Sequence, residues 1–316
     1  LLYIIIKKDN NKIMSIWNNP TLAKFNVIPE IKLTLGEGET ASSKFIFDGV
    51  KVIIKNEMAN PNGSFKDRSL AYQISYYLSK GYRKFTISSS GNAAIAAAAY
   101  ISLFKEAEID IFIGYKIIPE KSAKLYAFES DKVRIHQTNK PKSDSFKFAI
   151  ENKVLNLRGS SDDLALTGFK TIAYEIVVDH PKVDCVFLPT SSGTSALALH
   201  YGFEEMGKKV AIFVCQTATV HPIAKEFDHD FKKFPESLAD AIVDRVALRK
   251  SRLIEALKKN GGGGFVISND EISIAERETG LLGYWIDSPN SALAFAGFSK
   301  ALKKNMLDNF KQPLIL

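Results

Sequence analysis

The sequence predicts an α/β protein built on open, mostly parallel sheets. Short apolar runs rich in β-branched and aromatic residues alternate along the chain with longer segments of helical periodicity. Such alternation favours parallel strands joined by right-handed crossovers. The chain has 316 residues, of which 46% are hydrophobic and 24% charged. It can therefore bury a substantial core, and its length favours two closely joined domains over one.

The individual elements follow from the same patterns. Residues 45–47 and 50–54 flank Asp48-Gly49, a dipeptide favoured in type I′ turns, and so predict a hairpin. Strands are expected at the apolar runs 50–57, 84–88, 109–114, 131–137, 183–188, 209–215 and 264–267. Helices are expected at the periodic segments 64–80, 91–106, 119–129, 143–152, 167–179, 194–206, 219–227, 235–259, 270–279 and 289–305.

Residues 60–68 form the most informative segment, because a tight turn delivers a lysine to the start of a predicted helix. Pro61, Asn62 and Gly63 are turn formers, and Ser64 is expected to cap the helix. Lys66 then lies in the first turn, where unpaired backbone N–H groups disfavour a protonated amine and so favour a nucleophile or base. The same pattern also occurs in ordinary capped helices with a solvated lysine.

Two further loops follow predicted strands and precede predicted helices. Residues 88–92 read Ser-Ser-Ser-Gly-Asn before an alanine-rich helix, and small residues there let a ligand approach the backbone. Residues 190–195 read Thr-Ser-Ser-Gly-Thr-Ser, so hydroxyl groups and free N–H donors meet at the positive end of a helix, which suits a phosphate. Ligands gather at the carboxyl ends of parallel strands, so both loops are expected to face one cleft.

The glycine run at 261–264 gives a different prediction. It follows a predicted helix and precedes a strand, the reverse of the order in phosphate-binding loops. It is therefore interpreted as a flexible connection.

Taken in order, these segments resemble the fold type II family of pyridoxal-phosphate enzymes, and within it the threonine synthase-like branch. Three more segments are similar to motifs of that branch: Leu35-Gly36-Glu37-Gly38-Glu39-Thr40, the Gly-x-Lys-Thr helix within 167–176, and 287–292 as a variant of Glu-Pro-x-Ser-Ala. The resemblance implies two α/β domains of the tryptophan synthase β-like kind with the cofactor between them. It places a smaller domain at 66–155 and a larger one at 31–65 with 156–316, and leaves 1–30 as a separate N-terminal segment.

The resemblance also implies roles for single residues. Lys66 would join the aldehyde of pyridoxal 5′-phosphate and then transfer protons. Asn92 would hydrogen-bond the ring hydroxyl of the cofactor. The substrate carboxylate would be held by the loop that contains Ser89, Ser90, Gly91 and Ala93. The cofactor phosphate would be held by Ser191, Ser192, Gly193, Thr194 and Ser195.

The implied reaction is the conversion of O-phosphohomoserine and water to threonine and phosphate. On the family alignment Ser160 falls at a substrate-phosphate serine, but Ala165 replaces an arginine that commonly binds that phosphate, and Arg158 is the nearby cation that could take its place. A hydroxyl that faces the pyridine nitrogen in the family would lie beyond Leu316. A threonine or serine ammonia-lyase, a β-replacement enzyme, or an impaired cofactor-binding homologue therefore remain alternatives.

Composition and charge limit the classes of binding partner that the sequence favours. The net charge is +7, but the lysines are scattered from Lys7 to Lys311, which favours solvated faces and an anion-binding cleft over a nucleic-acid surface. No apolar run is long enough to span a membrane. Cys185 and Cys215 lie in apolar runs and are interpreted as core residues of a cytoplasmic protein, and the histidines show no metal-ligand spacing. A small amino-acid substrate and a homodimer are expected from the resemblance.

Overall fold

The computed structural model describes residues 2–5, 14–89, 91–284, 286 and 288–316. The chain divides into two compact units. Unit 1 comprises residues 1–40 and 57–171, and unit 2 comprises residues 41–56 and 172–316. Helix α6 (Leu164–Asp179) contains the boundary between residues 171 and 172. The domain boundaries expected from the sequence, at 66 and 155, stay a prediction.

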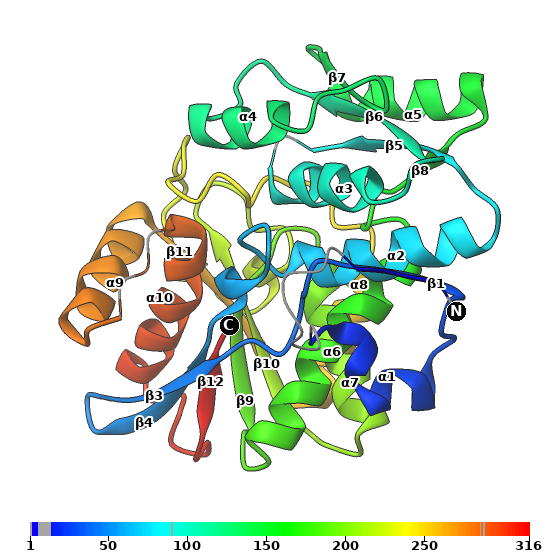
Figure 1. The fold of residues 1–316 in the computed structure, drawn as a ribbon. Coiled ribbons are helices and arrows are strands. Elements are labelled where there is room, and N and C mark those ends of the chain that lie inside the picture. Colours follow the sequence, from blue (N-terminus) through cyan, green and yellow to red (C-terminus); the bar gives the residue numbers. More distant parts are fainter. Residues whose placement is uncertain (1, 6–13, 90, 285, 287) are drawn as a thin grey trace. The chain divides into compact units, whose positions relative to one another are not determined.

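Unit 1 carries a four-stranded parallel sheet in the order β7-β6-β5-β8 and a separate parallel pair β1-β2 (Figure 1). Its strands are β1 (Leu2–Ile5), β2 (Ile31–Thr34), β5 (Lys84–Ser88), β6 (Glu108–Ile113), β7 (Val133–Gln137) and β8 (Leu155–Asn156). Its helices are α1 (Pro20–Phe25), α2 (Lys66–Ser79), α3 (Asn92–Ser102), α4 (Pro119–Tyr126) and α5 (Pro141–Asn152), with 3-10 turns at Ile16–Asn18 and Glu57–Ala59.

Unit 2 carries a six-stranded sheet in the order β11-β10-β9-β12-β4-β3, in which only the β3–β4 pair is antiparallel. Its strands are β3 (Ser42–Phe47), β4 (Val50–Lys55), β9 (Cys185–Pro189), β10 (Ala211–Thr217), β11 (Gly263–Ile267) and β12 (Pro313–Ile315). Its helices are α7 (Thr194–Glu205), α8 (Lys250–Lys259), α9 (Asn269–Leu281) and α10 (Pro289–Lys303), with a 3-10 turn at Ala224–Glu226. The predicted α/β class with mostly parallel sheets is thus confirmed.

The predicted hairpin is confirmed in its detail. Strands β3 and β4 pair around Asp48 and Gly49, whose φ angles of 46° and 79° are both positive. A type I′ turn requires positive φ at both central residues, and Asp and Gly tolerate it best.

Two helix predictions are wrong. Residues 235–249 form no helix, so α8 begins only at Lys250, and residues 219–227 contain a single 3-10 turn. The amides of the first segment are instead bound by side chains from other elements: Asn269 Oδ1 accepts from Leu238, and Asn290 Oδ1 accepts from Ala241. These tertiary hydrogen bonds replace the intrahelical ones that the apolar period suggested.

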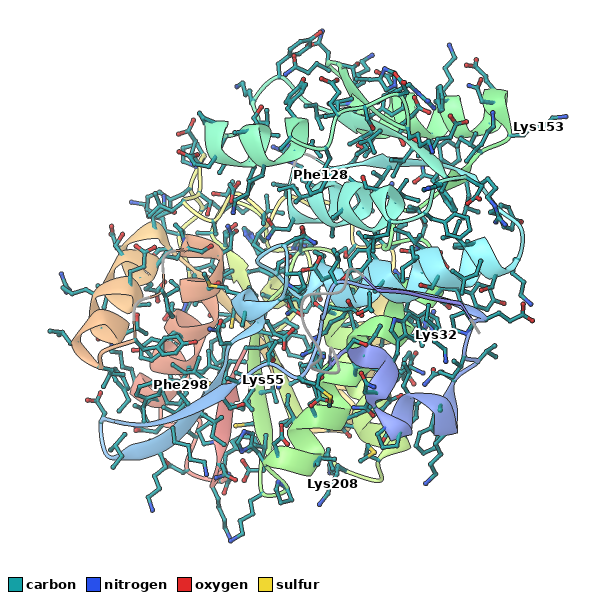
Figure 2. All side chains as sticks on the ribbon, viewed as in Figure 1. Lys32, Lys55, Phe128, Lys153, Lys208 and Phe298 are labelled. Carbon is teal, nitrogen blue, oxygen red and sulfur yellow. The ribbon has the colours of Figure 1, made fainter. Side chains whose placement is uncertain are left out.

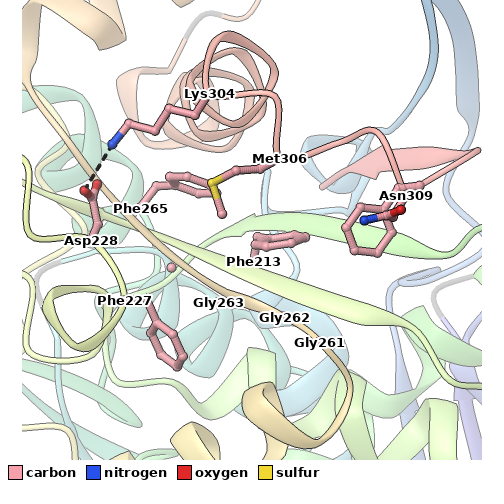
Figure 3. Close-up of a pocket in the computed structure, with 12 residues that line it drawn as sticks. Phe213, Phe227, Asp228, Gly261, Gly262, Gly263, Phe265, Lys304, Met306 and Asn309 are labelled. Atoms are coloured by element: carbon pink, nitrogen blue, oxygen red, sulfur yellow. Dashed lines mark ion pairs between the residues drawn. The ribbon is translucent and has the colours of Figure 1, made fainter.

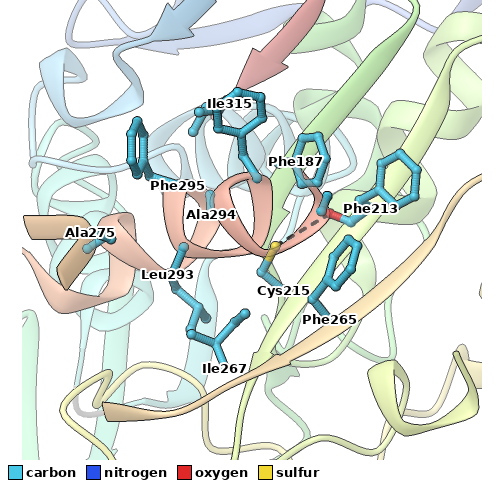
Figure 4. Packing of buried hydrophobic residues seen from close by; sticks show 14 of the residues in the cluster. Phe187, Phe213, Cys215, Phe265, Ile267, Ala275, Leu293, Ala294, Phe295 and Ile315 are labelled. Carbon is cyan, nitrogen blue, oxygen red and sulfur yellow. Dashed lines mark hydrogen bonds between the residues drawn. The ribbon is translucent and has the colours of Figure 1, made fainter. Parts of the chain in front are cut away.

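The core of unit 2 lies between its sheet and helix α10 (Figure 4). Phe187 and Phe213, on neighbouring strands, stack with ring centroids 4.8 Å apart. Cys215 is fully buried beside them, and burial raises the pKa of its thiol well above the ordinary range. Cys185 and Cys215 are both free and buried, as predicted for core residues. Among the described helices, none is long and apolar enough to cross a membrane.

Gly297 fixes how closely α10 approaches β10. A Cβ at this position would lie 2.2 Å from Cys215 Sγ, which is inside contact distance. We therefore expect Gly297→Ala to reduce the free energy of unfolding by about 1–3 kcal/mol, because the helix must move to make room. Gly114→Ala is the control, since its added Cβ meets only Pro141 Cγ at 3.9 Å, and we expect a change within about 0.5 kcal/mol. Urea denaturation of both variants measures the difference, and equal midpoints would contradict the packing argument.

The lysines differ sharply in exposure (Figure 2). Lys153 and Lys208 extend outward from the ribbon and are exposed, in keeping with solvated charge. Lys55 is 1% exposed and its Nζ lies 2.8 Å from Glu175 Oε2. Part of the positive charge that the sequence assigned to the surface is therefore buried in an ion pair.

Candidate active site

Lys66 is the first residue of α2. The N-cap is Phe65 rather than the predicted Ser64. A turn closed by the hydrogen bond from Asp67 N to Ser64 O, at 3.3 Å, precedes the helix, and the bond from Arg68 N to Phe65 O, at 3.2 Å, follows at its start. Phe65 offers no side-chain cap, and Ser64 Oγ lies 3.4 Å from Lys66 N. The lysine is thus placed at the start of the helix, as the sequence indicates.

The turn before Lys66 is closed by the residue after it. The Asp67 carboxylate accepts from Asn62 N and Asn62 Nδ2, both at 2.7 Å. Gly63 takes a φ of 84°, and its N–H donates to Asn60 O at 2.8 Å. Burial raises the pKa of Asp67 to about 6, against the hydrogen bonds from Asn62. The hydrogen bonds between Asn62 and Asp67 therefore hold together the backbone before and after Lys66.

Two aromatic rings surround the Lys66 amine. Nζ lies 4.7 Å from the centroid of Phe65 and 5.1 Å from that of Phe169, and the two rings pack edge to face. Phe169 lies on α6 in the segment similar to the Gly-x-Lys-Thr helix. Neither ring was identified from the sequence, although Phe65 immediately precedes the lysine. They restrict the amine to a half-buried position between apolar faces.

A buried ion pair lies next to this turn. Arg68 is 0% exposed, and its Nε and Nη2 each donate to the Glu57 carboxylate at 2.7 Å. Thr40 Oγ1 and Asn60 Nδ2 donate to the same carboxylate, at 2.6 and 2.9 Å, and Arg68 Nη1 donates to Thr171 Oγ1 at 3.1 Å. The pair anchors the backbone on both sides of Lys66, and sequence reasoning missed it.

Gly168 lets α6 approach the same backbone. A Cβ at Gly168 would lie 2.1 Å from Arg68 O. In the same motif Thr171 Oγ1 donates to Gly168 O at 2.6 Å, and Lys170 Nζ donates to Asn26 Oδ1 at 3.1 Å. The Gly-x-Lys-Thr motif therefore serves close packing in unit 1.

Glu37, in the Gly-Glu-Gly segment, is a fully buried carboxyl. Its Oε2 accepts from Thr34 Oγ1, Leu35 N and Tyr100 OH, the last at 2.7 Å. Within the described part of the chain, its Oε1 has no hydrogen-bond partner. Burial raises the pKa of Glu37 from its ordinary 4.5 to about 7, although these hydrogen bonds oppose the shift. The folded protein thus binds this proton more tightly than the unfolded chain does.

The raised pKa predicts a pH dependence of stability. Between about pH 4.5 and pH 7 the unfolded chain releases the Glu37 proton while the folded protein keeps it, so the free energy of unfolding falls as pH rises through this window. The loss amounts to about 3 kcal/mol. We expect Glu37→Gln, which is neutral at every pH, to flatten this part of the curve and to unfold at higher urea than the wild type above pH 7. Parallel curves for the two proteins would contradict the assignment.

The loop at 89–93 follows β5 and leads into α3. Gly91 is the N-cap, without a side-chain cap, and Asn92 is the first helical residue. Ser89 Oγ accepts from Gly91 N at 3.2 Å. Asn92 and Ala93 are half-buried, and Ser90 lies outside the described residues, as does Asp287 of the 287–292 segment.

The loop at 190–195 follows β9 and leads into α7 in unit 2. Gly193, at a φ of 87°, is the N-cap without a side-chain cap. The Ser192 and Thr194 hydroxyls lie 2.9 Å apart. Gln216, which is fully buried, donates Nε2 to the carbonyls of Thr190 and Ser191, and so braces the loop.

Ser191 is engaged within the protein. Its hydroxyl accepts from the backbone N–H groups of Val243 and Asp244 and donates to Asp244 Oδ2, at 3.1–3.2 Å. The hydroxyls nearest the α7 N-terminus are those of Ser192, Thr194 and Ser195.

The glycine run at 261–264 lies at the opposite end of the unit 2 sheet from the loop at 190–195. Gly263 pairs with Phe213 near the start of β10, whereas α7 follows the carboxyl end of β9. The order of helix, glycines and strand is as predicted. Figure 3 shows the cavity there, about 360 Å³ in volume, whose walls combine aromatic side chains, the glycine backbone and the ion pair between Lys304 and Asp228.

Comparison with known proteins decides the family. The family model described as "Pyridoxal-phosphate dependent enzyme" matches residues 34–312. The chain belongs to this family.

Similar relatives and structures support the same assignment. Threonine synthase of Methanocaldococcus jannaschii is 26% identical over 82% of this chain and 68% of its own length. Threonine synthase of Halalkalibacterium halodurans is 26% identical over 85% and 78%. In fold, the chain is similar to a pyridoxal 5′-phosphate-dependent aspartate racemase, with a TM-score of 0.75, 17% identity, and coverage of 87% and 88% of the two chains. As a member of this family, the protein has pyridoxal 5′-phosphate as its cofactor.

The donors at 192–195 fit the phosphate of this cofactor. The α7 N-terminus has no side-chain cap, so its first N–H groups have no side-chain acceptor there, and the hydroxyl groups of Ser192, Thr194 and Ser195 lie in the same short segment. At Gly193 a Cβ would lie 2.7 Å from Leu253 Cδ2, so the tight, positive-φ corner needs glycine. In unit 1, Lys66 carries a half-buried primary amine at the start of α2, the chemical group that reacts with an aldehyde.

The residues expected at the substrate phosphate lie after β8 in unit 1. Arg158 and Ser160 are half-buried, and Arg158 N donates to Asn156 Oδ1 at 3.1 Å. Ala165 is fully buried, packs against Gly159 and accepts from Ser69 Oγ through its carbonyl. The small side chain at 165 is therefore part of the packed interior, and Arg158 is the half-buried cation in this segment.

Proposed function

We propose that this pyridoxal-phosphate-dependent lyase converts O-phosphohomoserine and water into threonine and phosphate, a step of threonine biosynthesis. The observation that carries the proposal is that relatives named threonine synthase align over more than four fifths of the chain. The motifs around Lys66, Asn92 and Thr194 agree with it.

When bound, the cofactor withdraws electrons from the substrate and so acidifies its Cα proton. In our proposal Lys66 would hold the cofactor aldehyde until the substrate amine displaces it, and the freed Lys66 amine would then take and return protons at the substrate carbons. Phe65 and Phe169 keep water from two sides of that amine. Asn92 orients the ring hydroxyl of the cofactor.

The anionic groups are assigned to the two loops and to the segment after β8. The amides at 89–93 bind the substrate carboxylate at the uncapped start of α3. The donors at 191–195 bind the cofactor phosphate, with Ser191 acting mainly through its backbone because its hydroxyl binds Asp244. Arg158 and Ser160 bind the γ-phosphate of the substrate.

Incubation of the purified enzyme with O-phosphohomoserine, threonine and serine tests the reaction. We expect phosphate and threonine from O-phosphohomoserine in equal amounts, and little oxo acid from threonine or serine. Oxo acid from threonine without phosphate from O-phosphohomoserine would indicate an ammonia-lyase instead. Cofactor binding without any product would indicate an impaired homologue.

We further propose that the enzyme acts in the cytoplasm as a homodimer. The two cysteines are buried thiols, which suits a reducing compartment. Light scattering on the purified protein tests the dimer, and a monomer mass at working concentration would exclude it.

A further inference from the structure

A buried arginine lies beside the N-terminus of α7. Arg249 is 5% exposed, and its Nη1 donates to Thr194 Oγ1 at 3.2 Å. Thr194 is itself 5% exposed. Arg249 is the N-cap of α8 and closes the irregular segment 235–249 for which the sequence predicts a helix.

This segment is fastened to the loop at two points. Ser191 Oγ binds the backbone N–H groups of Val243 and Asp244, and the Arg249 side chain binds Thr194. The Asp244 carboxylate, which accepts from Ser191, brings negative charge to one end of the loop. The guanidinium brings positive charge to the other end, at the start of α7, where helix N–H groups already favour an anion.

The contact also restricts the direction of the Thr194 proton, which cannot point toward Arg249. A guanidinium can only donate, so Thr194 Oγ1 accepts from Arg249 and must donate its own proton elsewhere. Ser192 Oγ, 2.9 Å away, is one acceptor, and an anion at the helix start is another. A charged donor also polarises the hydroxyl and strengthens the bond it donates.

We propose that Arg249 is a positioning residue for the cofactor phosphate. It orients the Thr194 hydroxyl as a donor toward the phosphate and contributes positive charge at the α7 N-terminus. The inference rests on the proposed location of the cofactor phosphate at 191–195.

Comparison of pyridoxal phosphate with pyridoxal, which lacks the phosphate, tests the proposal in cofactor-free full-length protein. The variants are Arg249→Gln, Thr194→Val and the double variant. The control is Arg252→Gln, which removes an exposed arginine of the same helix that donates to Tyr201 OH. Dissociation constants come from titration of the absorbance change on binding, and ³¹P resonance of the bound cofactor reports the surroundings of its phosphate.

We expect Arg249→Gln and Thr194→Val each to raise the Kd of pyridoxal phosphate about tenfold, as for loss of a charge-assisted hydrogen bond. The Kd of pyridoxal should not change. The double variant should lose little more than either single variant, because both remove one hydrogen-bonded chain. The ³¹P signal should shift in both single variants and stay in place in Arg252→Gln.

Each other outcome has a defined meaning. If Thr194→Val leaves the preference for pyridoxal phosphate over pyridoxal intact, the loop does not hold the phosphate, and both the proposed site and this inference fall. Suppose that Thr194→Val reduces that preference. If Arg249→Gln then leaves the preference unchanged, or weakens the binding of pyridoxal phosphate and pyridoxal equally, only the role of Arg249 is overturned. Should Arg249→Gln fail to fold, Arg249→Lys, which keeps the charge, is measured instead. A preference for pyridoxal phosphate over pyridoxal that lies between those of the wild type and of Thr194→Val supports the role of Arg249. A preference equal to that of the wild type overturns it.

Discussion

Replacing Lys66 with alanine is expected to reduce turnover of O-phosphohomoserine by at least about a thousandfold and to prevent covalent trapping of the cofactor. Lys66 is at the first position of α2, with its amine between two aromatic rings, and the turn on either side is closed by Asn62 and Asp67. Among the described residues of the segments similar to the family motifs, no other lysine lies between two aromatic rings. Borohydride reduction of the cofactor-loaded enzyme, followed by peptide mass analysis, measures the trapping.

Lys80→Ala is the matched control for this prediction. Lys80 is exposed at the C-terminal end of the same helix, so its removal changes charge equally without touching the turn. We expect normal turnover and normal trapping on Lys66. A cofactor trapped on a different lysine in the wild type, or a Lys66→Ala protein with unchanged turnover, would overturn the proposed mechanism.

Glu57→Gln is expected to lower the free energy of unfolding by about 3–5 kcal/mol, because it leaves the buried Arg68 guanidinium facing a neutral amide. The two side chains are 5% and 0% exposed, and the carboxylate also accepts from Thr40 and Asn60. The turn that carries Lys66 follows directly, so cofactor binding should weaken with stability. Urea denaturation, with the slope compared between variants, measures the loss.

Two further variants separate charge from hydrogen bonding. Thr40→Val removes one donor to the carboxylate and is expected to cost only about 1 kcal/mol. Replacing both partners together, as Glu57→Leu with Arg68→Met, should recover much of the loss, because no unpaired charge then remains in the interior. A double variant as unstable as Glu57→Gln would show that packing, and not charge, dominates at this position.

The sequence was most informative where several residue types coincide within a short segment. Three such segments predict the start of a helix: the turn formers before Lys66, the Ser-Gly-Asn sequence at α3 and the hydroxyl-rich sequence at α7. The structure has a helix start at each of them. The type I′ hairpin could be predicted for the same reason, since Asp48-Gly49 is a local signal. Local conformational preference decides all of these positions.

Features that depend on distant partners could not be predicted. Residues 235–249 have the apolar spacing of a helix, yet Asn269, Asn290 and Ser191 bind their amides from other parts of unit 2. No local pattern reports such competition. The contact of Arg249 with Thr194 depends on this irregular path, and a regular helix there gave no reason to expect it.

The Glu57–Arg68 pair was missed for a related reason. Charged residues in a sequence are read as exposed by default, because few are fully buried without a partner. Here the partner is supplied eleven positions earlier in the chain. The aromatic neighbour Phe169 is likewise brought to Lys66 by the close approach that Gly168 permits.

Strand β12 has a consequence for how the protein is made. It lies between β9 and β4, so the hairpin formed by β3 and β4 has no hydrogen-bonded neighbour in the sheet until residues 313–315 arrive. During synthesis on the ribosome the hairpin leaves the exit tunnel well before its partner, residues 313–315, has been translated. The unit 2 sheet therefore closes only once residues 313–315 have left the ribosome, and until then β4 and β9 each present an open edge to chaperones and to other nascent chains.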